Sequence, residues 1–378
     1  MSGRVIVVGS VNIDLVARVP HLPHPGETVT GGSYERHQGG KGGNQAVAAA
    51  RLRRPTLFIG AVGDDTFEPE ARRALSAERV DVSMVASLPG QATGVALILV
   101  DAAGENEIAV VPGANGAIES GYVRDCLARL GPLVGDVLLV CNEVSLHVVR
   151  EALVCGHAAG ATTILNPAPA IGIDRSIFGL ADIVTPNRSE LVTLLQAEAG
   201  RSSRKTDSAT DTTIRARTLL APGPDGPGVR KAVIVTLGAA GAMVFERVGS
   251  GLGGTAAPRA EVGPLPEAVS GAAGSAGESD EAPKPAVAVA PATQDPPGAT
   301  RVGDLRIWEV PVARVATVDS TGAGDAFCGA LAAALAEGRP LAEAANRAVS
   351  AGALATTHVG AREGMPTAAE LEEFLAAR

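Results

Sequence analysis

Residues 319–330 read DSTGAGDAFCGA and place two glycines and an acid where an apolar helix begins. Gly322 and Gly324 lack β-carbons, so a ligand can approach the backbone closely. The first N–H groups of a helix have no intrahelical partner, and with the helix dipole they form a site for an anion. Asp325 beside a bound phosphate could take the proton of an attacking hydroxyl. The stretch predicts phosphoryl transfer, although Asp325 alone is explained more simply as a helix cap.

A second stretch with chemical potential is the glycine-rich segment 39–52, GGKGGNQAVAAARL. Four glycines surround Lys41, and Asn44 opens an apolar helix, so a cation and a two-way hydrogen bonder lie in one loop. The loop is not a Walker A motif, because a glycine follows the lysine where that motif requires Ser or Thr. A flexible turn explains the glycines on their own, whereas the pairing of Lys41 with Asn44 favours a ligand-binding loop.

Two shorter motifs place polar side chains next to strand ends. Asn12 and Asp14 are two residues apart, so in an extended strand they point to the same face, which suits sugar hydroxyls or an ordinary turn. Asn187 and Glu190 are one helical turn apart and could face one ligand or metal-bound water, or form a capping box. Neither a G-x-G-x-x-G after the first strand nor a G-x-S-x-G elbow is present, which disfavours a dinucleotide fold and acyl transfer.

Short β-branched runs alternate with helix-like segments along most of the chain. Several runs are apolar without alternation, as expected for strands that are covered on both faces. The predicted strands are 4–9, 56–62, 136–143, 162–169, 181–187, 231–238 and 306–311, and the predicted helices are 44–53, 67–79, 119–130, 146–159, 189–199, 323–337, 341–357 and 367–377. This order predicts a parallel α/β sheet.

Two kinds of segment interrupt this alternation. Residues 11–35 and 92–111 have the pattern of extended, more alternating strands and predict a small antiparallel sheet, a lid beside the main sheet. Residues 248–304 contain no aromatic residue and are rich in Gly, Ala, Pro, Ser and acids, so they cannot bury enough apolar surface to offset their ordering entropy. We expect a disordered insertion there and a flexible loop at 200–213, within one domain that spans 1–378.

The composition limits the classes of partner. The 378 residues carry a net charge of −9, which argues against nucleic acid and anionic membranes as partners. Aromatic residues make up only 2%, so the core must consist of Ala, Val, Leu and Ile. The four cysteines form no CxxC pair, and no apolar run is long enough for a signal peptide or a membrane span. The cytoplasm is therefore the expected location.

Taken together and in this order, the motifs resemble those of the PfkB carbohydrate kinase family. The matching segments are GSVNIDLV, PGETV, GGKGGNQAVAAA, TGVALI, GENEI, NPAPA, TPNRSE, TLGAAGA and DSTGAGDAFCGAL, and they extend from Val5 to Pro366 around the segment 248–304. The resemblance implies an α/β fold with a doubly wound, mostly parallel sheet flanked by helices and a small β-sheet lid. Members often dimerise through that lid, so a homodimer is expected.

The resemblance also implies a reaction, the ATP-dependent phosphorylation of D-ribose at its primary 5-hydroxyl to give ribose 5-phosphate and ADP. Asp325 would be the general base, and the backbone at Gly322, Ala323 and Gly324 would form the anion hole for the γ-phosphate. The sugar would be held by Asn12, Asp14, Gly40, Lys41, Asn44 and Glu143. On the nucleotide side, ATP would contact Asn187, Thr236, Gly238 and Gly324, and Glu190 would serve Mg²⁺.

Family members that phosphorylate ribose also use K⁺ beside the anion hole. The matching positions here are Asp319, Thr321, Ala355, His358, Gly360 and Gly364, several of them through backbone carbonyls, and Gly364 stands where the family often has a serine. Adenosine, pseudouridine and ketohexose kinases of the same family are alternatives, as is a non-catalytic sugar-binding regulator. A regulator would be expected to lose the base or the anion glycines, and this chain keeps Asp325, Gly322 and Gly324.

Overall fold

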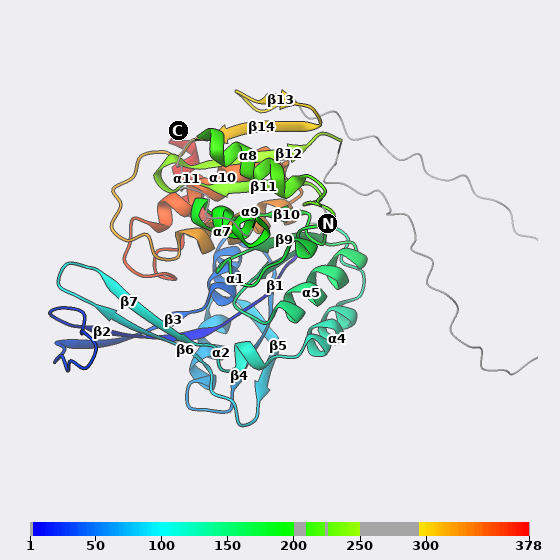
Figure 1. Ribbon diagram of the computed structural model, residues 1–378. Helices are drawn as coiled ribbons and strands as arrows, with labels where there is room; N and C mark the ends of the chain where they lie inside the picture. Colours follow the sequence, from blue (N-terminus) through cyan, green and yellow to red (C-terminus); the bar gives the residue numbers. More distant parts are fainter. Residues whose placement is uncertain (1–2, 200–208, 224–225, 250–294, 378) are drawn as a thin grey trace, which may run out of the picture.

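The structure is a computed structural model that describes residues 3–199, 209–223, 226–249 and 295–377 (Figure 1). These residues form a ten-stranded sheet and a four-stranded sheet. The large sheet has the strand order β13 (Thr300–Val302), β14 (Leu305–Val310), β12 (Ala242–Arg247), β11 (Ala232–Thr236), β10 (Ile183–Val184), β9 (Thr162–Asn166), β8 (Val137–Cys141), β1 (Val5–Val8), β4 (Thr56–Gly63) and β5 (Val80–Leu88). All neighbours from β11 to β5 are parallel, and β12, β14 and β13 form an antiparallel edge.

Helices cover both faces of the large sheet, which creates two hydrophobic cores. One face carries α1 (Lys41–Arg51), α2 (Glu68–Ala77), α9 (Ala323–Ala336), α10 (Leu341–Ala355) and α11 (Ala368–Ala376). The other carries α3 (Ala114–Ala117), α4 (Ser120–Leu130), α5 (Leu146–Ala158), α6 (Arg175–Phe178), α7 (Arg188–Ala199) and α8 (Ala209–Leu220). Successive side chains of a strand point to opposite faces, so in β1 Val5 and Val7 lie in the first core and Ile6 and Val8 in the second. The predicted doubly wound α/β fold is confirmed.

Helices α1 and α9 approach each other closely, and this contact positions the site. A β-carbon on Gly329 would lie 2.5 Å from the Ala48 β-carbon and 2.6 Å from the Gln45 carbonyl oxygen. Glycine and alanine along the two helices therefore allow a separation that larger side chains would prevent. As a result, the first turn of α9 lies within hydrogen-bonding distance of side chains on α1.

The four-stranded sheet projects from the body of the molecule (Figure 1). Its order is β3 (Ser33–Gly39), β2 (Asn12–Arg18), β6 (Gly94–Val100) and β7 (Asn106–Val111). The outer pairs are antiparallel, but β2 and β6 pair in parallel, so the prediction of an antiparallel sheet is wrong for the central pair. The sheet consists of two hairpins, β2–β3 and β6–β7, whose first strands both leave the large sheet in the same direction.

Two loop predictions are also wrong in part. Helix α8 begins at Ala209, within the predicted loop 200–213, because Ala216, Leu219 and Leu220 repeat at helical spacing and are buried. Residues 295–304, at the end of the predicted insertion, include β13, which pairs with β14. Asp295 links β13 to β14, because it accepts hydrogen bonds from Arg301 and Arg306, which lie opposite each other in the pairing. Residues 200–208 and 250–294 lie outside the described residues.

The longest helix in the described ranges, α10, has 15 residues. A membrane span needs about 20 consecutive apolar residues. In the part of the chain that the structure describes, no helix combines that length with sufficient hydropathy.

Candidate active site

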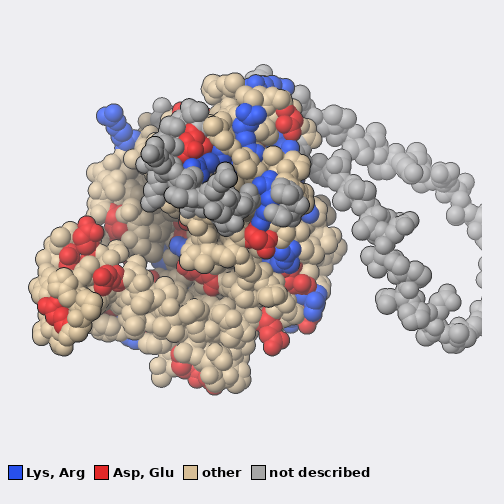
Figure 2. All heavy atoms as spheres, in the orientation of Figure 1, with Lys and Arg blue, Asp and Glu red and all other residues tan. Residues whose placement is uncertain are grey.

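The candidate site lies at the carboxyl ends of the central strands, beside the small sheet. Strand β1 pairs with β4 on one side and β8 on the other, and the chain adds β4 and β5 on the first side before it adds β8 to β11 on the second. Ligands of doubly wound proteins bind at such a switch point. Ser10 follows β1 and Glu143 follows β8, and the two side chains hydrogen-bond to each other there. Figure 2 shows a hollow between the small sheet and the body, with acidic and basic side chains at its floor.

Asp325 is buried in the first turn of α9 and points toward α1. Its side chain is 7% exposed, Oδ2 accepts a hydrogen bond from Asn44 Nδ2 at 3.1 Å, and Oδ1 accepts one from Gln45 Nε2 at 3.0 Å. Burial raises the pKa of Asp325, and Lys41 and the two amides oppose that rise. The N-cap of α9 is Gly322, and no side chain caps the helix. The interpretation of Asp325 as a helix cap is therefore wrong.

The backbone at the start of α9 is open to a ligand. Gly322 has a φ of 76° in the left-handed region, and a β-carbon there would lie 2.7 Å from the Ala361 carbonyl oxygen. Gly324 is exposed, and a β-carbon on it would meet nothing within 4 Å. The Ala323 N–H donates to the Ser320 carbonyl at 3.3 Å, whereas first-turn N–H groups in general have no partner inside the helix. An anion can reach this turn along the face of Gly324.

Lys41 and Glu143 meet beneath the glycine loop. Glu143 Oε2 accepts hydrogen bonds from the Lys41 N–H at 2.9 Å and from the Ser10 hydroxyl. Gly40, with φ 83°, makes the turn that precedes Lys41. Burial disfavours the charged form of Lys41, but the carboxylates of Asp325 and Glu143 outweigh burial and raise its pKa. A lysine cation and two carboxylates thus share one electrostatic environment.

Asn12 and Asp14 lie on β2, where the small sheet begins. Asn12 is buried, and its Oδ1 accepts a hydrogen bond from Asn115 Nδ2 at 2.8 Å. Asp14 faces Gly39 so closely that a β-carbon there would lie 2.2 Å from the carboxylate. Burial raises the pKa of Asp14 to about 6, and the positive charge of Arg362 opposes the rise. Asp14 therefore lies beside the start of the glycine loop, and Asn12 is packed against Asn115.

Asn187 and Glu190 form a reciprocal capping box at the start of α7. The Asn187 N–H donates to Glu190 Oε2 at 2.8 Å, and the Glu190 N–H donates to Asn187 Oδ1 at 2.8 Å. Burial raises the pKa of Glu190, while Lys41 opposes and Asp325 adds to the rise. Glu190 is thus both a capping residue and part of the same electrostatic environment as Asp325. The two alternatives that the sequence left open, a capping box and a side chain that faces a ligand or metal-bound water, are therefore compatible.

Thr236 and Gly238 lie beside this capping box, at the end of β11. Asn187 and Thr236 form a parallel β-bridge, and the Thr236 N–H donates to the Pro186 carbonyl at 3.0 Å. Gly238 is exposed with φ 59°, and a β-carbon on it would contact nothing within 4 Å. Among the described residues no group of three His, Cys, Asp or Glu side chains is arranged so that it could hold a metal ion. Glu190 fits Mg²⁺ nevertheless, because that ion commonly takes one or two carboxylates together with substrate phosphates.

The positions expected to bind K⁺ lie around the loop that follows α10. The Gly360 N–H donates to Asp319 Oδ2 at 2.9 Å, and the Thr321 N–H donates to Asp319 Oδ1 at 2.9 Å. A β-carbon on Gly364 would lie 2.4 Å from the Ala355 carbonyl oxygen and 3.3 Å from that of Gly360. The two carbonyls therefore converge at Gly364, in a place that does not fit a serine side chain.

His358 is the exception among these positions. It is exposed, and its ring contacts the neighbouring Thr357 hydroxyl at 3.0 Å. Only the backbone of His358 can therefore belong to the expected K⁺ site. Carbonyl oxygens are suitable ligands for K⁺, so the remaining donors fit this ion.

Sequence reasoning missed three buried polar residues that support the site. Gln45 Nε2 contacts Asp325 and also donates to Asn166 Oδ1 at 3.0 Å, and Asn166 Nδ2 donates to the Thr185 carbonyl at 3.2 Å. Arg362 Nε donates to Asn44 Oδ1 at 2.9 Å. The signal for Gln45 was a polar residue inside an apolar helix. Asn166 begins the NPAPA segment, to which no role was given, and no local pattern distinguishes Arg362.

Comparisons with known proteins agree with this geometry. The sequence profile described as pfkB family carbohydrate kinase matches residues 2–263 and 293–368. A ribokinase of Schizosaccharomyces pombe is 30% identical over 376 residues, 98% of this chain and 96% of the relative. The crystal structure of a Thermotoga maritima ribokinase has a TM-score of 0.73 and 27% identity over 99% of each chain. A Cryptococcus neoformans ribokinase in complex with ADP has a TM-score of 0.69 and 26% identity, over 98% of this chain and 99% of that one.

The family profile and the named relatives identify the class of protein as a sugar kinase, and the buried carboxylate beside an open helix N-terminus agrees with that class. The family profile matches far more than half of the chain. The chain therefore belongs to the pfkB family of carbohydrate kinases, and the relatives named above within that family are ribokinases.

Proposed function

We propose that the protein is an ATP-dependent ribokinase that phosphorylates the 5-hydroxyl of D-ribose. The observation that carries the proposal is the geometry of Asp325, a buried carboxylate held by two amide donors directly beside the open first turn of α9. The S. pombe relative and both solved neighbours are ribokinases, and the Cryptococcus neoformans structure holds ADP. These relatives support ribose as acceptor and ATP as donor.

In the proposed reaction Asp325 accepts the proton of the 5-hydroxyl as the oxygen attacks the γ-phosphorus of ATP. The new O–P bond forms while the bond from the γ-phosphorus to the β,γ-bridging oxygen breaks, and ADP leaves with that electron pair. The backbone amides at the start of α9, those of Gly322, Ala323 and Gly324, would stabilise the negative charge of the transferring group. The Ala323 N–H would give up its 3.3 Å contact with the Ser320 carbonyl for this purpose. Lys41 adds a positive charge near both the base and the phosphate.

The sugar would lie in the hollow between β2 and the glycine loop. Asp14 and Glu143 supply acceptors, Lys41 supplies a cation, and Asn12 and Asn44 can each donate and accept. This mixture suits a molecule with several hydroxyl groups, because each hydroxyl both donates and accepts. Gly40 serves the turn that brings Lys41 to this place, because its φ is 83° and a β-carbon there would lie 2.7 Å from the Val11 α-carbon.

The nucleotide would lie over the ends of β10 and β11. Asn187, Thr236 and Gly238 border this side, and Gly324 faces the γ-phosphate. Glu190 would hold Mg²⁺, which neutralises phosphate charge when it is bound. Asp319, with the backbone carbonyls of Thr321, Ala355, His358, Gly360 and Gly364, would hold K⁺, which supplies positive charge behind the anion hole.

The small sheet supports a proposed homodimer. Its strands β3, β6 and β7 expose large apolar side chains, namely Tyr34, Leu97, Ile108, Val110 and Val111. Exposed apolar groups of this extent commonly mark an interface. Light scattering of the purified protein should give the mass of two chains, and Ile108→Lys should shift it toward one chain. A monomeric mass for the unmodified protein at micromolar concentration would exclude this dimer.

A substrate panel tests the proposed reaction. Purified protein with ATP, Mg²⁺ and K⁺ should release ADP fastest with D-ribose, compared with 2-deoxyribose, fructose and adenosine. Preference for another acceptor would place the enzyme elsewhere in the family. If the protein binds ribose in a calorimeter but releases no ADP with any acceptor, it is a sugar-binding regulator.

A further inference from the structure

Arg362 is a buried arginine in the loop after α10 that the proposed reaction does not use. It is only 5% exposed, and it lies against the start of α1 and the end of β3. Nε donates to Asn44 Oδ1 at 2.9 Å, and Nη2 donates to the Gly39 carbonyl at 2.9 Å. Nη1 is buried without a hydrogen-bond partner in the part of the chain that the structure describes. Such a costly burial of a permanent charge requires an explanation.

The contact with Asn44 fixes which end of that amide faces Asp325. A guanidinium can only donate hydrogen bonds and an ionised carboxylate can only accept them. Asn44 must therefore turn Oδ1 toward Arg362 and Nδ2 toward Asp325, as the structure shows with distances of 2.9 Å and 3.1 Å. If the Asn44 amide were reversed, its NH₂ group would face the donors of Arg362, and its oxygen would face the carboxylate oxygens of Asp325. Arg362 thus controls Asn44, and Asn44 holds the base.

The loop that carries Arg362 connects several parts of the site. Arg51 Nη1 donates to the carbonyls of Arg362 at 2.7 Å and Met365 at 2.8 Å, which anchors the loop backbone. The carbonyl of Ala361 lies under Gly322, at the start of α9. The Glu363 carboxylate contacts His37 Nδ1, on strand β3 of the small sheet, at 3.5 Å. Arg362 therefore lies where the small sheet, the loop and α9 meet.

We propose that Arg362 is a positioning residue, which holds the Asn44 amide so that its NH₂ group orients Asp325 for proton removal. Arg362 connects the base to the loop that carries the candidate K⁺ carbonyls, and it does not touch substrate. The inference rests on the proposed role of Asp325 as the base. It goes beyond that role because it names the residue through which the loop after α10 acts on catalysis.

A double-mutant cycle between Arg362 and Asn44 tests this coupling. We expect Arg362→Met to lower kcat by about 10- to 100-fold, because misplacement of a reacting group by about 1 Å has an effect of that order. In an Asn44→Leu background the same change should lower kcat by less than about twofold, since the residue through which Arg362 acts is already absent. If the loss of kcat in the double variant equals the product of the losses in the two single variants, the two residues act independently and the proposal is overturned.

A second substitution separates geometry from charge. Arg362→Lys keeps a positive charge beside Asp14 but offers a single ammonium group in place of the fork that holds Asn44 and Gly39. We expect its kcat to remain close to that of Arg362→Met. Recovery of the original kcat would show that charge alone is required and would overturn a positioning role. If Arg362→Met does not fold, the cycle is performed with Arg362→Lys.

Arg51 provides a matched control. It anchors the backbone of the same loop and pairs with Glu78, but it does not contact Asn44. Arg51→Met should lower Tm and leave kcat at saturating ribose within about threefold. In the double variant with Asn44→Leu, the effect of Arg51→Met on kcat should be as large as it is alone, so that the two effects multiply. An Arg51→Met enzyme as slow as Arg362→Met would show that loop anchoring, and not the Asn44 contact, is what matters.

A readout that does not need turnover separates this inference from the proposed function. In protein labelled with ¹⁵N-asparagine, the Asn44 NH₂ signals can be assigned by their loss in Asn44→Leu. They should be protected from exchange in the unmodified protein and exchange at least about tenfold faster in Arg362→Met. Absence of ribose turnover together with this change would reject the proposed substrate and keep the contact, whereas unchanged exchange would reject the contact.

Discussion

Helices α7 and α9 both begin at the site with an acid as their third residue, yet the two acids have different roles. In α7 the residue before the helix is Asn187, and Glu190 closes a capping box with it. In α9 the residue before the helix is Gly322, which has no side chain, and Asp325 accepts its hydrogen bonds from α1 instead. An acid in a first turn is thus available for chemistry when the N-cap offers no partner and a neighbouring helix does.

The largest effect expected from this difference follows removal of Asp325. Asp325→Ala should lower kcat by about 10²- to 10⁴-fold, the usual contribution of a general base. Ribose binding should persist, because the remaining sugar contacts are unchanged. ADP release and calorimetric binding of ribose measure the two properties. Loss of kcat of the same size in Glu190→Ala would contradict the distinction between the two acids.

The next effect concerns the donors that α1 provides to Asp325. Gln45→Leu removes one hydrogen bond that lowers the pKa of the base, so that pKa should rise. The base acts when it is deprotonated, and the acid limb of the kcat profile should therefore move to higher pH, since the lost hydrogen bond favoured the charged carboxylate.

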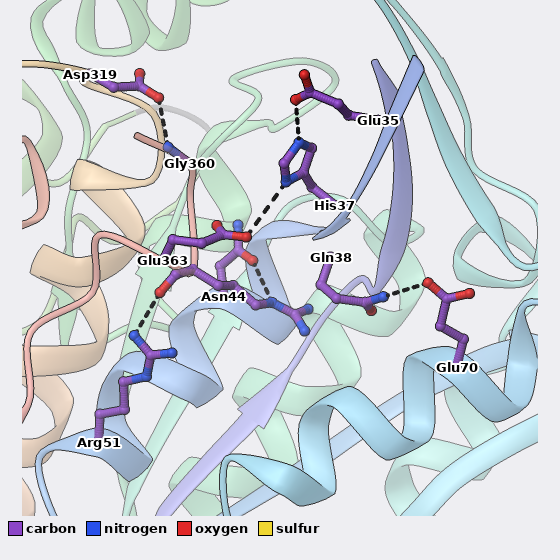
Figure 3. A network of polar contacts seen from close by, with 10 residues as sticks. Glu35, His37, Gln38, Asn44, Arg51, Glu70, Asp319, Gly360 and Glu363 are labelled. Carbon is purple, nitrogen blue, oxygen red and sulfur yellow. Dashed lines mark hydrogen bonds and ion pairs between the residues drawn. The ribbon is translucent and has the colours of Figure 1, made fainter. Parts of the chain in front are cut away.

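Gln38→Leu is the matched control for this prediction. Gln38 Nε2 donates to Glu70 Oε1 at 3.0 Å and does not contact the base (Figure 3). Its pH profile should match that of the unmodified enzyme. An acid limb at the same pH in all three proteins would show that Gln45 does not set the pKa of Asp325.

The glycines of α9 separate stability from catalysis. Gly322→Ala should lower the free energy of unfolding by about 1–3 kcal/mol, because its left-handed backbone and the Ala361 carbonyl at 2.7 Å from a new β-carbon both oppose a side chain. Gly324→Ala should fold normally, since the space is open there, but should lower kcat by covering the anion site. Denaturant unfolding and ADP release test the pair, and equal stability losses would contradict this assignment.

The sequence predicted the parts of this comparison that are local. Apolar runs without alternation indicated the parallel sheet, and the glycines around Asp325 indicated an anion site at a helix start. It did not predict that Asp325 would bond to Gln45, 280 residues away, because that contact depends on how closely α1 packs against α9. Arg362 lies 318 residues from Asn44, and its role depends on the path of a loop. The parallel pair β2–β6 was likewise missed, because strand direction depends on where each hairpin leaves the large sheet.

The smallest expected effect is on the free energy of unfolding, and it separates the capping role of Glu190 from its proposed role in holding Mg²⁺. Glutamine can replace glutamate in a capping box, so Glu190→Gln should change the free energy of unfolding by less than about 0.5 kcal/mol, whereas Glu190→Ala should lower it by about 1 kcal/mol. Both changes remove the carboxylate that would hold Mg²⁺ and should raise the Mg²⁺ concentration needed for half-maximal rate. Denaturant unfolding and Mg²⁺ titration of ADP release separate the two properties. A Glu190→Gln enzyme with an unchanged Mg²⁺ requirement would leave Glu190 with the capping role alone, and the two helix starts would then differ even more than the structure suggests.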